Sequence, residues 1–158
     1  MKTIYYKIKK IYIERGICMD KEKIIISDKI SIKEFCKLRE SVNFQKLTEE
    51  QAERVLAHTA FIITAIYNEC YIGLTRILFD YVTDAYITDV IVHPDYQGCG
   101  VGGTLIQKAI EYLKTNTTPG LKVSCCLYAN AGKEAFYQKY GFQKLPNDKY
   151  GYGMFIEL

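Results

Sequence analysis

The stretch Asp89–Thr104 reads DVIVHPDYQGCGVGGT, and it decides how the rest of the chain is interpreted. It begins with an apolar run, Val90–Val92, that favours a buried strand and ends at Pro94. A glycine-rich turn, Gly98–Gly103, follows, and apolar residues then recur at helical spacing. A strand, a glycine-rich turn and a helix start in succession direct backbone N–H groups toward one point, which suits a phosphate-bearing ligand.

Two familiar phosphate-binding patterns fit this stretch incompletely. Residues Gly98–Gly103 match G-x-G-x-x-G, but a dinucleotide-binding fold needs an acidic residue about 20 positions later to hold the ribose. Residues 114–133 contain no Asp or Glu. Thr104 stands where a P-loop has its lysine. A purely structural role, in which the glycines only make a tight turn, stays open at this point.

The composition indicates one globular domain without a membrane-spanning segment. The 158 residues suffice for one sizeable core, and no apolar run approaches the roughly 18 residues that a spanning helix needs. Residues 1–23 carry seven Lys or Arg against three acids, so the rest of the chain is nearly neutral and lacks the basic face of a nucleic-acid-binding domain. We therefore expect neither a membrane nor a nucleic acid as partner.

The cysteines and histidines indicate a reduced protein without a metal site. The six cysteines form no C-x-x-C pair, and adjacent Cys125 and Cys126 would point to opposite faces of a strand. The two histidines, His58 and His93, have no metal-binding spacing. Because the N-terminus also lacks the features of a secretion signal, we expect reduced thiols, a cytoplasmic location and no metal.

The residue pattern predicts elements in the order β-α-α-β-β-β-α-β-α-β. Strands are expected at 23–27, 61–67, 71–80, 86–93, 121–128 and 154–158, and helices at 31–40, 48–58, 102–114 and 133–140. Ser31 and Thr48 begin capping boxes. Three successive central strands favour an antiparallel meander, and strands separated by helices favour parallel pairing. The predicted fold class is α/β, with a mixed six- to seven-stranded sheet flanked by about four helices.

The chain is expected to contain one domain at 21–158, preceded by an N-terminal extension at 1–20. Met19 is a candidate for the natural start, which would leave residues 1–18 outside the native protein. Mass spectrometry of the native N-terminus would decide this point.

Two separate motifs resemble one family. The glycine-rich turn and the strand before it resemble the acetyl-CoA loop of the Gcn5-related N-acetyltransferase (GNAT) superfamily, whose Q/R-x-x-G-x-G/A pattern is matched by Gln97, Gly100 and Gly102. Residues Leu127–Phe142 are similar to the family's A-N-x-x-A-x-x-F-Y-x-x-x-G-F segment. The resemblance covers roughly residues 24–158. It implies the acyl-CoA N-acyltransferase (GNAT) fold and a transferase that uses acetyl-CoA as cosubstrate.

The resemblance implies a donor site built mainly from backbone. The pyrophosphate is expected at the N–H groups of the turn, and the pantetheine arm along Val90–Val92, in a gap opened by a β-bulge. Backbone N–H groups near Val90 and Ile91 would face the thioester oxygen. Asn130 would bind the pantetheine amide, or else cap the helix at Lys133. The expected acetyl-CoA-binding residues are Val90, Ile91, Val92, Gln97, Gly98, Cys99, Gly100, Val101, Gly102, Gly103, Thr104, Asn130 and Tyr137.

Tyr137 is the predicted general acid, because the family places the tyrosine of this motif beside the thioester sulfur. A CoA thiolate leaves when an amine attacks, and reference pKa values of ~8.5 for a thiol and ~10 for tyrosine make proton transfer only modestly uphill. A packing ring is the alternative. The amine must itself lose a proton, which costs roughly 4.6 kcal/mol at pH 7 for a pKa of ~10.4. Asp89 is the candidate base or water-orienting group, with a structural hydrogen bond as its alternative.

The acceptor is expected to be a primary amine of a small molecule that attacks directly in a ternary complex. Its pocket would be formed by the first two helices, the loop at Phe44 and the Tyr150–Tyr152 turn. Arg76 would bind an acidic group of the acceptor or be held in a salt bridge, and His93 would support the loop. A protein or peptide amine is one alternative acceptor, and a CoA-binding sensor without turnover is another function. Dimers are common in the family, so a homodimer also stays open.

Overall fold

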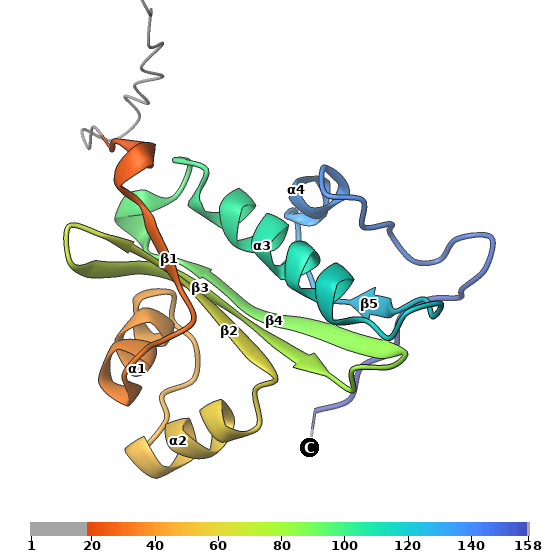
Figure 1. Cartoon of the computed structure of the whole chain (residues 1–158), viewed down its shortest axis with the longest axis horizontal. Helices are drawn as coiled ribbons and strands as arrows, with labels where there is room; N and C mark the ends of the chain where they lie inside the picture. The colour runs from red at the N-terminus through yellow and green to blue at the C-terminus, as the bar shows by residue number, and fades with distance from the viewer. Residues whose placement is uncertain (1–18, 158) are drawn as a thin grey trace, which may run out of the picture.

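The computed structural model describes residues 19–157 and shows a sheet between two layers of helices (Figure 1). The helices α1 and α2 cover one face of the sheet, and α3 covers the other. The strands are β1 (Ile25–Ser27), β2 (Phe61–Tyr67), β3 (Cys70–Phe79), β4 (Asp84–Val92) and β5 (Ser124–Cys126), and the helices are α1 (Ile32–Ser41), α2 (Glu49–Ala57), α3 (Val101–Asn116) and α4 (Glu134–Gln138). Two short 3-10 helices, η1 (Lys21–Lys23) and η2 (Pro94–Tyr96), complete the list.

The strands lie in the order β1-β2-β3-β4-β5. The predicted antiparallel meander of β2, β3 and β4 is confirmed, as is the parallel pairing of β5 with β4. Asn68 and Glu69 join β2 to β3 with φ values of 47° and 62°. Positive φ at both central residues is what a type I′ hairpin turn requires, and that turn follows the natural twist of its strands.

The helices begin where their capping residues predict. The Ser31 hydroxyl accepts a hydrogen bond from the Glu34 N–H, and Thr48 forms a complete capping box with Gln51. The third helix begins one residue before the prediction, at Val101, and runs to Asn116. No helix of the described residues is long and apolar enough to cross a membrane.

The core lies on both faces of the sheet. On one face, the apolar side of α3, which includes Leu105 and Ile106, packs on sheet residues such as Ile63. On the other face, Phe35 of α1 and Ala52 of α2 lie in a second buried cluster. Each fully buried aliphatic or aromatic side chain stabilises the fold by about 1.5–3 kcal/mol. The two clusters fix the sheet from both sides.

The chain before β1 also packs on the domain. Met19 is buried in the core cluster under α3, and the Asp20 N–H donates to the Tyr67 hydroxyl. These two residues belong to the predicted N-terminal extension. The rest of that extension, and Leu158 at the other end, lie outside the described residues.

The sheet has five strands in the described residues, so the predicted count of six to seven is wrong for this part of the chain. Residues 154–157 were expected in a final strand, but they form none, and Met154 and Phe155 are exposed. Strand β5 has three residues instead of the predicted eight. Apolar alternation favours a strand, but a strand forms only where a neighbour satisfies its backbone groups. The short β5 offers few such partners.

Candidate active site

The β5 side of β4 is paired only at the beginning of the strand. Residues Asp84–Tyr86 pair in parallel with Ser124–Cys126. From Ile87 to Val92, β4 has no strand partner on this side among residues 19–157. The predicted gap beside Val90–Val92 is therefore free of strand pairing, although the Val92 carbonyl accepts a hydrogen bond from the Gln97 side chain.

The other side of β4 contains a β-bulge. Between the pair of Leu74 with Ile91 and the pair of Arg76 with Thr88, β4 has one residue more than β3. Asp89 lies in this bulge with a φ of 49°. The left-handed conformation costs an ordinary L-residue roughly 1–2 kcal/mol, and Asp tolerates it better than most. The surrounding contacts must therefore hold Asp89 in place.

Those contacts are two arginines. Arg39 Nη1 of α1 donates to Asp89 Oδ1 at 2.8 Å, and Arg76 Nε of β3 donates to Asp89 Oδ2 at 2.6 Å. The side chains of Arg39, Arg76 and Asp89 are only 13%, 11% and 7% exposed. Arg76 Nη1 also donates to Thr59 Oγ1 at 2.9 Å. Of the two roles expected for Arg76, the structure shows the salt bridge.

The glycine-rich turn lies at the end of β4 and opens α3. Gly100 is the N-cap of α3 with a φ of 87°, and no side chain caps the helix. The turn is tied to the strand because Gln97 Nε2 donates to the Val92 carbonyl at 3.0 Å. Lys21 lies close by, since a Cβ added to Gly100 would be 2.6 Å from Lys21 Nζ. A helix N-terminus without acidic residues, with an ammonium group beside it, suits an anion.

The other residues around the turn support its shape. Cys99 is buried and its thiol contacts the Gln97 carbonyl at 3.7 Å, while the Thr104 hydroxyl contacts the Gly100 carbonyl at 3.4 Å. His93 Nδ1 accepts from the Asp95 N–H, which caps η2. The supporting role expected for His93 agrees with this contact.

The predicted acid, Tyr137, lies on α4 beside the start of α3. Its ring packs edge-on against Phe136 and Phe142. A Cβ added to Gly102 would be 3.4 Å from Phe136 and 3.5 Å from Val92, so α4, α3 and the end of β4 meet here. Burial raises the pKa of Tyr137 above its ordinary value. The phenol therefore stays protonated through the neutral range.

Asn130 lies in the exposed turn before α4. Its backbone carbonyl accepts from the Lys133 N–H at 2.9 Å. Lys133 is the N-cap of α4 and makes no side-chain capping bond. The alternative role of Asn130, as the cap of this helix, is therefore not what the structure shows.

The two parts of the predicted acceptor pocket lie at different points along β4. The Phe44 ring stacks on the Arg39 guanidinium at 5.3 Å, beside Asp89. Tyr150 instead contacts Ser124 and lies near Asp84, at the opposite end of the strand. Phe44 thus remains beside the bulge, whereas the Tyr150–Tyr152 turn does not join it there.

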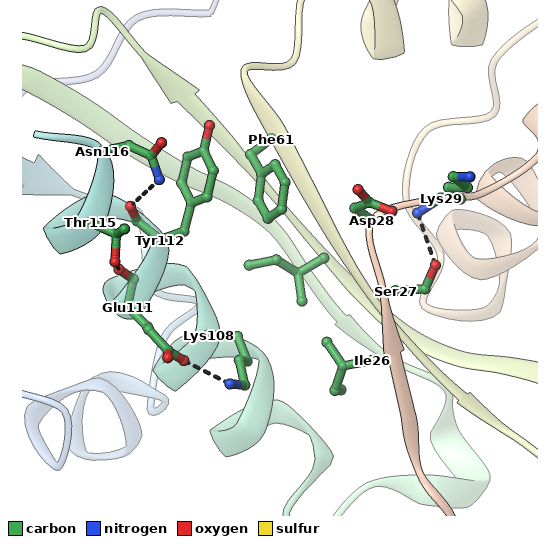
Figure 2. Close-up of a pocket in the computed structure, with 11 residues that line it drawn as sticks. Ile26, Ser27, Asp28, Lys29, Phe61, Lys108, Glu111, Tyr112, Thr115 and Asn116 are labelled. Carbon is green, nitrogen blue, oxygen red and sulfur yellow. Dashed lines mark hydrogen bonds and ion pairs between the residues drawn. The ribbon is translucent and has the colours of Figure 1, made fainter.

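A separate hollow of about 640 Å³ lies between β1, β2 and α3 (Figure 2). Figure 2 shows the stacked rings of Phe61 and Tyr112 and the ion pair of Lys108 with Glu111 on its walls. No residue of β4 lines it, so it is not part of the candidate active site. Within residues 19–157, no group of three or more His, Cys, Asp or Glu side chains could hold a metal ion.

The sequence patterns did not indicate Arg39 or Thr59. These residues lie 50 and 30 positions from Asp89 in the chain, and no motif links them. One signal was present: a charged residue, Asp89, inside an apolar strand requires a buried partner. The sequence patterns also gave no indication that Lys21 lies beside the glycine-rich turn, because this residue precedes every recognised motif.

Comparisons with known proteins agree with this geometry. The profile of the acetyltransferase (GNAT) family matches residues 29–142. An uncharacterized N-acetyltransferase, ycf52 of Pyropia yezoensis, is 30% identical over 122 residues, which cover 75% of this chain and 68% of that protein. The uncharacterized N-acetyltransferase YjhQ of Escherichia coli is 30% identical over 100 residues, or 59% of this chain and 51% of that protein.

A solved structure shows the same fold. The crystal structure of a probable acetyltransferase from meticillin-resistant Staphylococcus aureus matches with a TM-score of 0.73 and 26% identity, over 85% of this chain and 99% of that chain. This match covers more of the chain than the family profile, which spans residues 29–142. The chain therefore belongs to the acetyltransferase (GNAT) family, whose members transfer the acetyl group of acetyl-CoA to an amine acceptor.

Proposed function

We propose that this enzyme acetylates a primary amine of a small molecule, by direct attack on acetyl-CoA in a ternary complex. The observation that carries the proposal is the unpaired edge of β4 at Ile87–Val92, which ends at the glycine-rich start of α3. An extended pantetheine arm can pair with such an edge as an added strand. The pyrophosphate would then reach the free N–H groups at the helix N-terminus.

The proposed donor site follows from this placement. The backbone of Val90, Ile91 and Val92 would bind the pantetheine arm. The turn would bind the pyrophosphate through the N–H groups of its backbone, and the exposed side chain of Asn130 is free to turn toward the pantetheine amide. The turn residues in this role are Gln97, Gly98, Cys99, Gly100, Val101, Gly102, Gly103 and Thr104.

Tyr137 is the proposed general acid. Burial raises its pKa, so the phenol holds its proton until the CoA thiolate forms. The thiolate then takes that proton and leaves as the free thiol of CoA. Its place beside Phe136, which lies next to Gly102 at the start of α3, supports this role.

Asp89 was the sequence candidate for the base. Its two carboxylate oxygens already accept hydrogen bonds from Arg39 and Arg76. We therefore assign Asp89 its alternative, structural role, and propose that solvent water removes the proton of the attacking amine. The amine enters in its neutral form after it has lost one proton to bulk water. It then attacks the thioester carbon, and a second N–H proton passes to water as the C–S bond breaks.

One relative favours a second acceptor class. The protein named histone acetyltransferase TAP1 of Glycine max is 36% identical over 75 residues, or 48% of this chain and 31% of that protein. Its name describes that protein, but it is the reason to test a protein or peptide amine here as well. A small amine remains the first choice, since this relative matches less than half of the chain.

The experiment measures CoA thiol release with a broad panel of amines, together with calorimetric binding of acetyl-CoA. The panel contains alkyl, arylalkyl, polyamine and amino-sugar acceptors, and peptides with a free α-amine or lysine. We expect release with at least one small amine. Thiol release with peptides alone would show that the acceptor is a protein or peptide amine and not a small molecule. Binding of acetyl-CoA without any release would indicate a sensor, and no binding would overturn the proposal.

We also propose a cytoplasmic location with reduced thiols. Cys36, Cys70, Cys99, Cys125 and Cys126 are all free in the described part of the chain. A relative of Arabidopsis thaliana, 35% identical over 75 residues, is named as chloroplastic, which gives the competing location. A fluorescent fusion of the full chain distinguishes the two.

A further inference from the structure

A buried cluster of charged side chains joins a helix on one face of the sheet to the bulge in β4. We call Arg39, Asp89 and Arg76 the clamp. Arg39 comes from α1, Arg76 from β3 and Asp89 from the bulge itself. Their contacts of 2.8 and 2.6 Å are the short, charge-assisted kind, and all three side chains are at most 13% exposed.

The clamp is not explained by stability alone. Two guanidinium groups share one carboxylate, so the cluster keeps a surplus positive charge in a buried place. Arg39 Nε is buried and has no hydrogen-bond partner within the described residues. A buried ion pair is often no more stabilising than apolar side chains of similar size. A buried cluster with a surplus charge and an unpartnered nitrogen suggests a role other than stabilising the fold.

The backbone beside the clamp indicates that role. Thr75 Oγ1 donates to the Thr88 carbonyl at 3.1 Å, in the gap that the bulge leaves in the ladder. Asp89 and Val90 therefore have no register partner on β3, and β5 does not reach them. The φ of 49° at Asp89 rotates the peptide that carries the Val90 N–H. Without the clamp, this segment would be free to return to extended geometry.

We propose that the clamp is a positioning device for the donor: it holds Asp89 in the left-handed conformation and so directs the Val90 N–H at the thioester carbonyl of acetyl-CoA. The inference rests on the proposed function. Arg39, Asp89 and Arg76 touch no reacting atom in this scheme. They act through the backbone, by fixing a donor where negative charge develops on the oxygen.

Arg39 is the member that can be tested most cleanly. Arg76 and Asp89 lie on adjacent strands and remain paired without it. The Arg39 side chain lies against the rings of Phe35 and Phe44, at 5.6 and 5.3 Å. Methionine retains much of that apolar contact and removes the charge. Arg39→Met therefore removes one of the two arginine contacts of Asp89. The ion pair of Arg76 with Asp89, which is neutral overall, remains.

The test uses isotope-edited infrared spectroscopy of acetyl-CoA labelled at the carbonyl carbon. It needs no knowledge of the acceptor. For the wild-type protein, we expect the bound carbonyl band to move to lower frequency than in free acetyl-CoA, because the N–H donates to it. In Arg39→Met, the band should return toward its free position while the dissociation constant stays within about twofold. With an amine acceptor, kcat should fall about 10- to 100-fold, with little change in KM for acetyl-CoA.

Two further variants complete the test. Arg39→Lys can still reach one carboxylate oxygen, so it should restore part of the band shift and part of kcat. Arg54→Met removes an arginine of an exposed pair on α2 and should change neither. If Arg39→Met does not fold, Arg39→Lys gives the answer through an intermediate band position.

The outcomes separate the two proposals. If the wild-type protein does not bind acetyl-CoA, the proposed function fails. If it binds acetyl-CoA but its carbonyl band stays at the free position, the clamp inference fails. The inference fails equally if both Arg39 variants keep the wild-type band and kcat.

Discussion

The two halves of β4 differ sharply although they form one strand. The first half, Asp84–Tyr86, which we call the closed half, is paired with β5 throughout and with β3 at Ala85 and Tyr86. The second half, Ile87–Val92, which we call the open half, contains the bulge and lacks a strand partner toward β5. It leads into the glycine-rich turn. The comparison teaches that a short neighbour and one extra residue leave part of an interior strand with an unpaired edge. Apolar side chains occur in both halves and do not distinguish them.

The largest effect is expected at the bulge in the second half. Asp89→Asn removes the negative charge between two buried guanidinium groups. Breaking a buried ion pair from one side leaves the remaining charge unpaired and lowers the free energy of unfolding by about 3–5 kcal/mol. Urea denaturation monitored by circular dichroism measures this loss.

The matched control for Asp89→Asn is Glu50→Gln, which breaks the exposed pair of Glu50 and Arg54 at 3.4 Å. Exposed pairs contribute little, so the expected change is within about 0.5 kcal/mol. Equal losses in the two variants would show that the bulge has no special role in the fold.

The next effect concerns Tyr137 of α4, the acid proposed to act beside the open half. Tyr137→Phe should lower kcat about 10²- to 10³-fold, because the leaving thiolate loses its proton donor, while KM for acetyl-CoA stays nearly constant. Burial raises the pKa of Tyr137, and an acid is lost only above its pKa. The wild-type rate should therefore show no decline from this group between pH 6 and 9, as a pH profile of kcat would verify.

Tyr112→Phe is the control for that substitution. Tyr112 lines the hollow of Figure 2, away from β4, and burial there raises its pKa to about 12. Its loss should leave kcat unchanged. Full activity of Tyr137→Phe near neutral pH would mean that Tyr137 is only a packing ring.

A smaller effect is expected at the end of the open half. Gly100→Ala forces a side chain into a φ of 87° and places its Cβ 2.6 Å from Lys21 Nζ. We expect the dissociation constant of CoA to rise about tenfold, because the added Cβ pushes the Lys21 ammonium away from the turn that is proposed to bind the pyrophosphate. Isothermal calorimetry measures it.

Gly120→Ala controls for the backbone strain. Gly120 has a φ of 85°, and an added Cβ would meet nothing within 4 Å. Both alanine variants should lose roughly 1–2 kcal/mol of stability, but only Gly100→Ala should bind CoA more weakly. Similar binding losses in both would assign the effect to stability and not to the turn.

The parts of the molecule that short-range patterns encode were predicted well from the sequence. Capping residues and apolar periodicity marked α1, α2 and α3, and β2 has its predicted bounds. The turn at Gly98–Gly103 marked the end of the open half, because positive φ and close approach need glycine. These signals lie within a few residues of the feature that they determine.

The parts that depend on distant partners were predicted incompletely. The length of β5 and the absence of a strand at 154–157 depend on which backbone groups meet in space. Arg39 and Arg76 reach Asp89 from 50 and 13 positions away. An acid in an apolar strand indicated that some cation was needed, but not which one. For the same reason, the sequence did not show that Phe44 and Tyr150 lie at different points along β4.

The smallest expected effect tests the closed half directly. Cys125 and Cys126 lie on β5 beside that half, in register with Ala85 and Tyr86. Burial raises the pKa of Cys125 to about 11, so at pH 8 it should react with iodoacetamide about 100-fold more slowly than an ordinary thiol. The exposed Cys126 should react readily.

Saturating acetyl-CoA should change neither rate by more than about twofold, because the donor is expected along Ile87–Val92 and not along the paired residues. The single variants Cys125→Ser and Cys126→Ser separate the two neighbouring thiols in the labelling experiment. Strong protection of Cys126 by acetyl-CoA would place the donor across the closed half. The division of β4 into a structural half and a binding half would then no longer hold, since ligand contact would begin where strand pairing is complete.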